Sequence, residues 1–159
     1  QEIQRMQHVT GLVKKTLTDI SDAVDGKIIM TPEIVDAINA IFDARVPGKW
    51  LYDPSGAEIS WLMPTLGLWF NSLLDRYTQL NGWLRNGRLT YYHLGNFFNP
   101  QGFLTAMKQE VTRQHKNDKG GESWSLDDVE FSTEVLTVEN PDKLKDAPPE
   151  GVYIHGLFL

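Results

Sequence analysis

Apolar residues recur at steps of three and four along four stretches of the chain, which is the period of an amphipathic helix. Polar and charged residues occupy the intervening positions of each stretch. The pattern therefore predicts four helices, of which the third has the broadest apolar face. The predicted helices span residues 2–24, 32–45, 65–84 and 100–113.

Local residue choices mark where these helices begin and end. Thr31-Pro32 and Asn99-Pro100 each place a capping side chain before a proline, which has no N–H to lose at the first helical position. Gly26 stands where the first helix should end, because glycine accepts the left-handed conformation of a helix C-terminus.

Residues 46–64 are punctuated by proline and glycine and predict irregular structure. Trp50 and Trp61 lie among these helix-breaking residues. A segment with such large rings gains free energy by burying them. We expect it to lie over the core, held there by its aromatic side chains.

Strand-like patterns predominate in the last third. Apolar and polar residues alternate over 129–135, and 151–159 forms a second apolar stretch. Residues 89–98 are aromatic and punctuated by glycine, consistent with a short extended segment. Helices followed by strands predict an α+β fold, and two strands alone are marginal, so further strands should complete the sheet.

The largest apolar side chains of the third and fourth helices, with the aromatic pair before the fourth, are the expected core. These residues are Trp69, Phe70, Leu73, Phe97, Phe98, Phe103 and Leu104. The polar side of the third helix should carry Asn71, Asp75, Arg76 and Gln79, with Asp75 and Arg76 as an exposed charge pair of little energetic worth.

Composition narrows the function classes. The protein has 159 residues, 41% hydrophobic and 23% charged, which is typical of a globular domain. With 15 Lys and Arg against 21 Asp and Glu, the net charge is −6. This charge argues against nucleic-acid binding and against an anionic membrane surface. No cysteine is present, so disulfides, zinc–thiolate sites and thiol catalysis are excluded.

The sequence contains no motif for catalysis, cofactor binding or metal binding. Phosphate-binding loops, dinucleotide fingerprints, zinc-protease motifs and nucleophile elbows are all missing, and Gly120-Gly121 is interpreted as a linker. His8, His93, His115 and His155 lack the spacing of metal ligands. We therefore assign no catalytic residue, no cofactor-binding residue and no metal ligand.

Two residue groups resemble sites but are better explained by packing or capping. Trp83, Arg85, Arg88, Tyr91 and Tyr92 mix basic and aromatic residues, as single-strand binders do. At a net charge of −6 and with apolar helix positions among them, core packing is the favoured interpretation. Asp127 and Asp128 are adjacent, so helix capping or solvation is favoured over paired acid–base chemistry.

Both ends of the sequence have the character of internal sequence. It starts at Gln1 already in helical rhythm and stops in the apolar run Gly156-Leu157-Phe158-Leu159. Natural termini are usually polar and frayed. We expect a fragment of a longer protein, and the alternative is a strand docked at a true end.

Four strings resemble the C-terminal region of dynein heavy chains, especially the axonemal kind. They are Ile41-Phe42-Asp43-Ala44-Arg45-Val46-Pro47 with Trp50, Thr65-Leu66-Gly67-Leu68-Trp69-Phe70, the run from Gly95 to Arg113, and Glu150-Gly151-Val152-Tyr153-Ile154-His155-Gly156-Leu157. The third string, GNFFNPQGFLTAMKQEVTR, is the most specific, and its part from Asn99 to Arg113 is similar to outer-arm dyneins. The resemblance runs in order through all 159 residues, and Leu51–Ser60 resembles a variable loop.

This resemblance implies a domain that begins helical and ends in a small β-barrel lying across one face of a ring of six AAA+ modules. Residues 1–120 would be its helical part, and residues 121–159 the start of a β part whose later strands lie beyond Leu159. Phosphate-binding loops would then belong to the ring, which holds ATP and Mg²⁺, and not to this segment.

The resemblance also implies a function and partners. The segment would be a non-catalytic part of a minus-end-directed microtubule motor of cilia and flagella, packing on the AAA+ ring of its own heavy chain and tuning its cycle. Through that polypeptide it would join intermediate chains, light chains and microtubules at the axoneme, in the cytoplasm and cytoskeleton. The alternative is a free-standing protein-interaction module, which exposure of Trp50 and Trp61 would favour.

Overall fold

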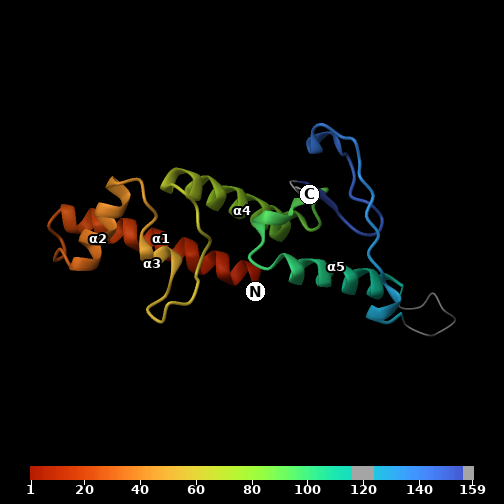
Figure 1. Cartoon of the computed structure of the whole chain (residues 1–159), viewed down its shortest axis with the longest axis horizontal. Helices are drawn as coiled ribbons and strands as arrows, with labels where there is room; N and C mark the ends of the chain where they lie inside the picture. Colours follow the sequence, from red (N-terminus) through yellow and green to blue (C-terminus); the bar gives the residue numbers. More distant parts are fainter. Residues whose placement is uncertain (116–123, 156–159) are drawn as a thin grey trace. The chain divides into compact units, whose positions relative to one another are not determined.

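A computed structural model describes residues 1–115 and 124–155 (Figure 1). The protein forms two compact units, Gln1–Leu80 and Asn81–Leu159, which are considered separately below. The predicted linker at Gly120-Gly121 and the last four residues of the predicted strand at 151–159 lie outside the described residues.

The first unit is helical. It contains α1 (Glu2–Val24), α2 (Pro32–Phe42), the short α3 (Gly48–Leu51) and most of α4 (Leu66–Asn86). The helix predicted over 2–24 is confirmed, and Gly26 follows it with a φ of +74°. The second helix ends at Phe42, three residues earlier than expected, where Ala44 turns into the left-handed region at a φ of 55°.

Both predicted caps are present. The Thr31 hydroxyl accepts a hydrogen bond from the Ile34 N–H over 3.4 Å, and the Asn99 side chain accepts one from the Gly102 N–H over 2.9 Å. Each cap is followed by a proline in the first turn. The two helix starts therefore follow from local sequence alone.

The second unit combines one helix with a small sheet. Its elements are β1 (Tyr91–His93), the 3₁₀ turn η1 (Leu94–Asn96), α5 (Pro100–Gln114), two further 3₁₀ turns, η2 (Leu126–Asp128) and η3 (Pro141–Lys143), and β2 (Tyr153–His155). β1 and β2 pair in parallel, with Tyr91 opposite Tyr153 and His93 opposite His155. The connection between them contains α5, as a parallel pair requires a long crossover.

The strand predicted over 129–135 is wrong. These residues form no strand, and Phe131 and Val135 are exposed. Alternation alone does not make a strand, because its backbone groups need a partner ladder, and no described segment supplies one here. β1 also precedes α5, so the strands do not all follow the helices, although the α+β class agrees with the structure.

The predicted core is confirmed in part. Trp69, Leu73, Phe97 and Phe103 are buried, whereas Phe70, Phe98 and Leu104 are half-buried. In the first unit the core is built from one side of each helix. Its buried apolar residues are Met6, Val9, Val13, Ala23, Ile34, Ala37, Ala40, Trp50, Trp69, Leu73 and Leu80.

Candidate interaction surface

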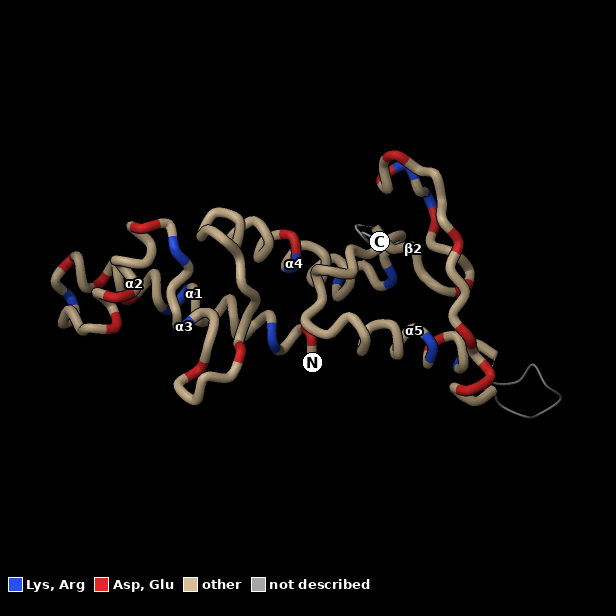
Figure 2. Tube along the Cα trace, in the orientation of Figure 1, with Lys and Arg blue, Asp and Glu red and all other residues tan. Residues whose placement is uncertain are grey.

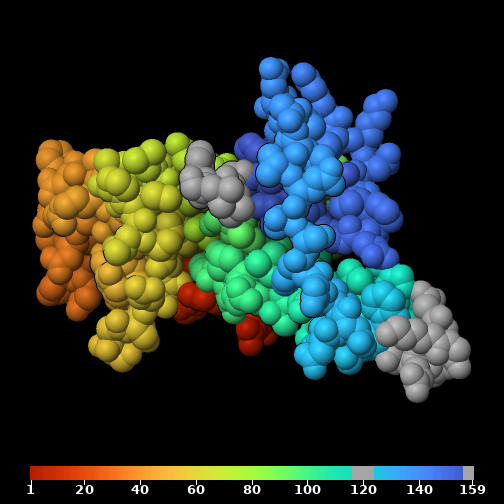
Figure 3. Space-filling model, turned by 45° about the vertical axis from the view of Figure 1, so that its right-hand side comes forward, coloured from red at the N-terminus to blue at the C-terminus, as the bar shows by residue number. Residues whose placement is uncertain are grey.

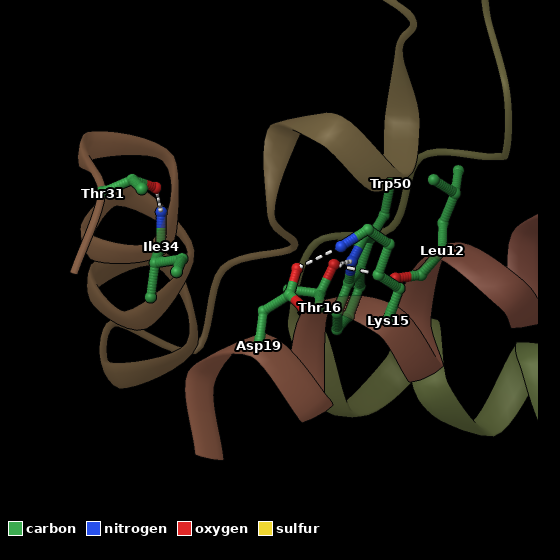
Figure 4. Close-up of polar contacts among 7 residues, drawn as sticks. All are labelled: Leu12, Lys15, Thr16, Asp19, Thr31, Ile34 and Trp50. Atoms are coloured by element: carbon green, nitrogen blue, oxygen red, sulfur yellow. Dashed lines mark hydrogen bonds and ion pairs between the residues drawn. The ribbon is translucent and has the colours of Figure 1, made fainter. Parts of the chain in front are cut away.

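A buried hydrogen-bonded pair fixes α3 against α1. The Trp50 indole N–H donates to the Thr16 hydroxyl oxygen over 3.0 Å, and the Thr16 hydroxyl donates onward to the Leu12 carbonyl over 2.8 Å (Figure 4). Trp50 is only 1% exposed, and its carbonyl accepts a bond from the Ser60 hydroxyl over 2.7 Å. Each of these buried polar groups therefore has a partner, which is the condition for burying it without a large penalty.

Stacked rings hold the irregular segment between α3 and α4. Trp69 lies 5.2 Å from both Trp50 and Trp61, measured between ring centroids, and its N–H donates to the Trp61 carbonyl over 3.1 Å. The expectation that this segment lies over the core and is held by its rings is confirmed. Because Trp50 is buried and Trp61 is stacked, these tryptophans belong to the core, which weakens the interaction-module alternative.

Arg76 is part of the core of the first unit and not of its surface. Its side chain is 8% exposed, and its guanidinium lies 4.1 Å from the Trp61 ring centroid. The predicted surface charge pair with Asp75 is therefore wrong, because the aromatic segment folds over this turn of α4. Burial lowers the pKa of Arg76 to about 10, so the group still carries its charge at pH 7.

The second unit contains an aromatic cluster of Trp83, Tyr92, Phe97 and Phe103. Phe97 and Phe103 stack with centroids 4.2 Å apart, and Trp83 meets Phe103 edge-on at 5.8 Å. Arg88 donates to the backbone carbonyls of Pro149 and Gly151. The basic and aromatic residues between Trp83 and Tyr92 thus pack within the unit, and the packing interpretation is confirmed for Trp83 and Tyr92.

The histidines lie apart from one another or in pairs. His115 stacks on Trp124 at 4.4 Å and contacts the Glu150 carboxylate, while His93 and His155 face each other across the sheet with centroids 5.9 Å apart. His8 lies on α1. Within residues 1–115 and 124–155, no three His, Asp or Glu side chains gather to hold a metal ion.

Asp128 caps the 3₁₀ turn η2, which confirms the capping interpretation of Asp127-Asp128. Its carboxylate accepts hydrogen bonds from the Ser125 N–H over 2.7 Å and from the Ser125 hydroxyl over 3.0 Å. Acidic and basic positions are interspersed along the described residues without a continuous basic stretch (Figure 2). No helix in the described part of the protein has the length and apolar character needed to cross a bilayer.

The outer face of α2 is apolar and uncovered. Seven of the eleven residues of this helix are apolar: Ile34, Val35, Ala37, Ile38, Ala40, Ile41 and Phe42. Ile34, Ala37 and Ala40 are buried, but Phe42 is 89% exposed and Val35 is also exposed. We call Val35, Ile38 and Phe42 the α2 outer face; the helix lies at the molecular surface in the orange region of Figure 3. Glu33, Asp36 and Asn39 occupy the remaining, polar side of the helix, so the exposed apolar residues form a stripe between the buried side and the polar side.

A second apolar surface runs along the seam between α1 and α4. A groove of about 510 Å³ is lined by α1 from Thr10 to Asp22 and by Phe70 and Leu73 of α4. Leu74 and Tyr77 continue the α4 wall at helical spacing from Phe70 and are exposed. We call this surface the α1–α4 groove. The hydrophobic periodicity predicted that all these α4 residues face the core. The apolar side of α4 is wider than one neighbouring helix can cover, and this width was the signal that part of it would remain exposed.

These features define a packed domain with aromatic cores and large uncovered apolar faces. The sequence matches the C-terminal domain of dynein heavy chains over residues 1–159. It is 46% identical over 159 residues to dynein axonemal heavy chain 5 of Mus musculus and 47% identical over 160 residues to the dynein gamma chain, flagellar outer arm, of Chlamydomonas reinhardtii. It is 43% identical to dynein axonemal heavy chain 8 of Homo sapiens.

The protein therefore belongs to the family of C-terminal domains of dynein heavy chains, and these relatives are axonemal, as the sequence resemblance indicated. Each of these matches spans all of this sequence but only 3% of the relative. The names of the relatives agree with the expected placement in the axoneme of a cilium or flagellum, within the cytoskeleton.

Proposed function

We propose that this protein acts as the C-terminal segment of an axonemal dynein heavy chain, a minus-end-directed, ATP-driven microtubule motor. In this proposal it packs on the AAA+ ring of its own heavy chain and tunes the ATPase cycle without binding nucleotide. ATP and Mg²⁺ belong to the ring, and contacts with microtubules, intermediate chains and light chains belong to the parent complex.

The α2 outer face is the observation that supports this proposal best. Burying Phe42 against a partner surface would contribute about 1.5–3 kcal/mol, and Val35, which is already more than half-buried, would contribute a smaller amount. Ile29, between α1 and α2, is 85% exposed and is a further uncovered apolar side chain of the first unit. Exposed apolar surface of this kind is typical of a domain that packs on another one.

A domain fixed to a ring face can change the populations of ring states. A contact that differs in free energy between two states shifts their equilibrium by that difference, and couplings of about 1–3 kcal/mol correspond to 5–150-fold. The same logic gives the segment a regulatory role that requires no catalytic residue of its own.

We also propose that residues 1–120 are the helical part of the domain and that residues 121–159, which contain β2, begin a small β-barrel; β1 lies within the first part and pairs with β2. The supporting observation is that a two-stranded sheet is marginal by itself and needs further strands or a packed face. Among the described residues, β1 and β2 pair only with each other.

The test uses the full-length heavy chain. We expect Phe42→Lys to change the ATPase rate and the microtubule gliding speed by about fivefold, a coupling of about 1 kcal/mol. The matched control, Asn71→Lys, adds the same charge at an exposed polar position of α4 and should leave both rates unchanged. Deleting residues 1–159 without any effect on ATPase rate or gliding speed would overturn the proposal.

A further inference from the structure

Three side chains hold the connection between η2 and β2 against the rest of the second unit. This connection, residues 129–152, contains the 3₁₀ turn η3 and otherwise no helix or strand, so no backbone ladder fixes it. The three contacts join residues 35 to 63 positions apart, and we call them the tethers. They are Arg88 with the Pro149 and Gly151 carbonyls, Tyr91 with the Asp142 carboxylate, and His115 with the Glu150 carboxylate.

One of the three tethers changes its charge near neutral pH. The guanidinium of Arg88 stays protonated throughout this range. The bond to Asp142 raises the pKa of Tyr91 above its ordinary value of 10, so this phenol also keeps its proton. An unperturbed histidine titrates at about pH 6.5, and the contact of His115 with Glu150 is an ion pair only while the imidazole is protonated.

The surroundings of His115 favour its protonated form. It is the C-cap residue of α5, where the helix dipole stabilises a positive charge. Its ring stacks on Trp124 with centroids 4.4 Å apart, and its side chain is 22% exposed, so the ion pair is screened less than one in open solvent. The charged residues on the described elements that pack around it are mostly acidic: Glu150 on the connection, Asp127 and Asp128 on η2, and Arg113 on α5 itself.

We infer that the His115–Glu150 contact is a pH-dependent tether, which holds the connection against the C-terminus of α5 while His115 is protonated and loosens it when the proton is lost. Because Glu150 lies just before β2, the tether also restrains the segment that leads into the sheet. The stabilisation is complete at low pH and is lost as the pH rises through the pKa of the imidazole. The inference concerns the second unit alone and does not rest on the proposed function.

Hydrogen exchange of the full-length heavy chain, followed by mass spectrometry of peptides that cover residues 140–152, tests the inference. His115→Asn replaces the imidazole by a planar, uncharged amide. We expect these peptides to exchange about threefold faster in the variant than in the unmodified protein at about pH 5.5, and equally fast at about pH 8.5. Both proteins are compared at the same pH, so the intrinsic pH dependence of amide exchange cancels. The matched control, His8→Asn, changes an exposed histidine of α1 and should leave these peptides unaffected at both pH values.

Two further variants separate the charge of His115 from its packing. Glu150→Gln removes the other partner and should reproduce the effect of His115→Asn at about pH 5.5. His115→Lys keeps a positive charge at about pH 8.5 and should there slow the exchange about threefold relative to the unmodified protein.

A His115→Asn effect of equal size at both pH values would show that ring stacking alone holds the connection, and would overturn the inference. Unchanged exchange in His115→Asn or in Glu150→Gln at acidic pH would also overturn it, as would a His115→Lys variant that exchanges like the unmodified protein at alkaline pH.

Discussion

At the scale of single residues, the first unit depends on polar atoms that are buried with their partners. Trp50 joins α3 to α1 through Thr16, and its buried indole N–H has no access to water as a substitute acceptor. Removing one member of such a pair leaves the other unsatisfied, which costs more than the net worth of the bond itself.

We therefore expect Thr16→Val to destabilise the 159-residue protein by about 1–3 kcal/mol, because the variant keeps the shape of threonine but gives Trp50 no acceptor. Urea denaturation followed by tryptophan fluorescence measures the change. Thr10→Val is a matched control, since the Thr10 hydroxyl makes the same bond to its own helix and receives none from an indole. Equal stability of the two variants would contradict the role assigned to the Trp50 bond.

At the scale of elements, helix propensity and N-terminal capping favour different residues at position 102, near the start of α5. Gly102 lies in the first turn, where alanine would favour the helix by about 1 kcal/mol. A Cβ at this position would lie 2.8 Å from Asn99 Nδ2 and 3.1 Å from Asn99 Cγ, so the capping side chain would have to move. Glycine at position 102 leaves room for the Asn99 side chain to cap the helix.

The prediction is a non-additive pair of substitutions. Gly102→Ala alone should change the free energy of unfolding little, because the gain in helix propensity is offset by a lost cap worth about 1 kcal/mol. Asn99→Ala alone should destabilise by about 1 kcal/mol, and Gly102→Ala added to it should stabilise by about 1 kcal/mol. Urea denaturation of the unmodified protein and the three variants gives the coupling, and simple additivity would refute the conflict between Asn99 and a Cβ at 102.

A tyrosine connects β1 to the polar loop before β2. The Tyr91 hydroxyl donates to an Asp142 carboxylate oxygen over 2.8 Å, and this bond raises the pKa of Tyr91 above its ordinary value of 10. Since the protonated phenol is favoured in the folded state, its contribution to stability is complete below pH 10 and is lost as pH rises through the raised pKa.

Tyr91→Phe should consequently be less stable than the unmodified protein at about pH 8, and the difference should shrink at about pH 11, above the ordinary tyrosine pKa. Urea midpoints at the two pH values measure it. Tyr77→Phe serves as the control, because Tyr77 is exposed on α4 and its hydroxyl makes no hydrogen bond with the described residues. A Tyr91→Phe difference that is the same at both pH values would show that the Asp142 bond does not stabilise the fold.

The sequence predicted those elements whose causes are local. The starts of α2 and α5 follow from a capping side chain and a proline, and the periodicity of α1 and α4 predicted their extents to within two residues. The strand over 129–135 failed because a strand depends on a partner elsewhere in the sequence. Arg76 was misplaced because periodicity does not show which later or earlier segment folds over a helix.

The interaction surface was harder to predict than the helices for the same reason. The apolar stripe of α4 divides into a buried part, with Trp69 and Leu73, and an exposed part, with Leu74 and Tyr77. Periodicity is the same for both parts, so the distinction requires knowing where α1 lies. The family resemblance supplied the biological setting, but only the structure separates core from uncovered surface.

At the scale of the whole molecule, apolar surface that is uncovered in the 159-residue protein must be either covered by a partner or tolerated in water. The α2 outer face is the clearest case, because Phe42 is almost fully exposed at the end of α2 and Val35, two turns earlier on the same side, is also exposed. Exposed patches of this kind lead to association of isolated domains, since two copies can bury them against each other.

We expect the isolated domain to self-associate with increasing concentration, and the double variant Val35→Ser, Phe42→Ser to weaken this association by at least about tenfold, which corresponds to about 1.4 kcal/mol. Sedimentation velocity over a wide concentration range measures it.

The control, Asn71→Ser and Thr78→Ser, changes two exposed polar residues of α4 and should associate like the unmodified protein. If the double variant associates as strongly as the control, association arises from another surface, such as the α1–α4 groove or the open sheet edges, and the α2 outer face is tolerated in water.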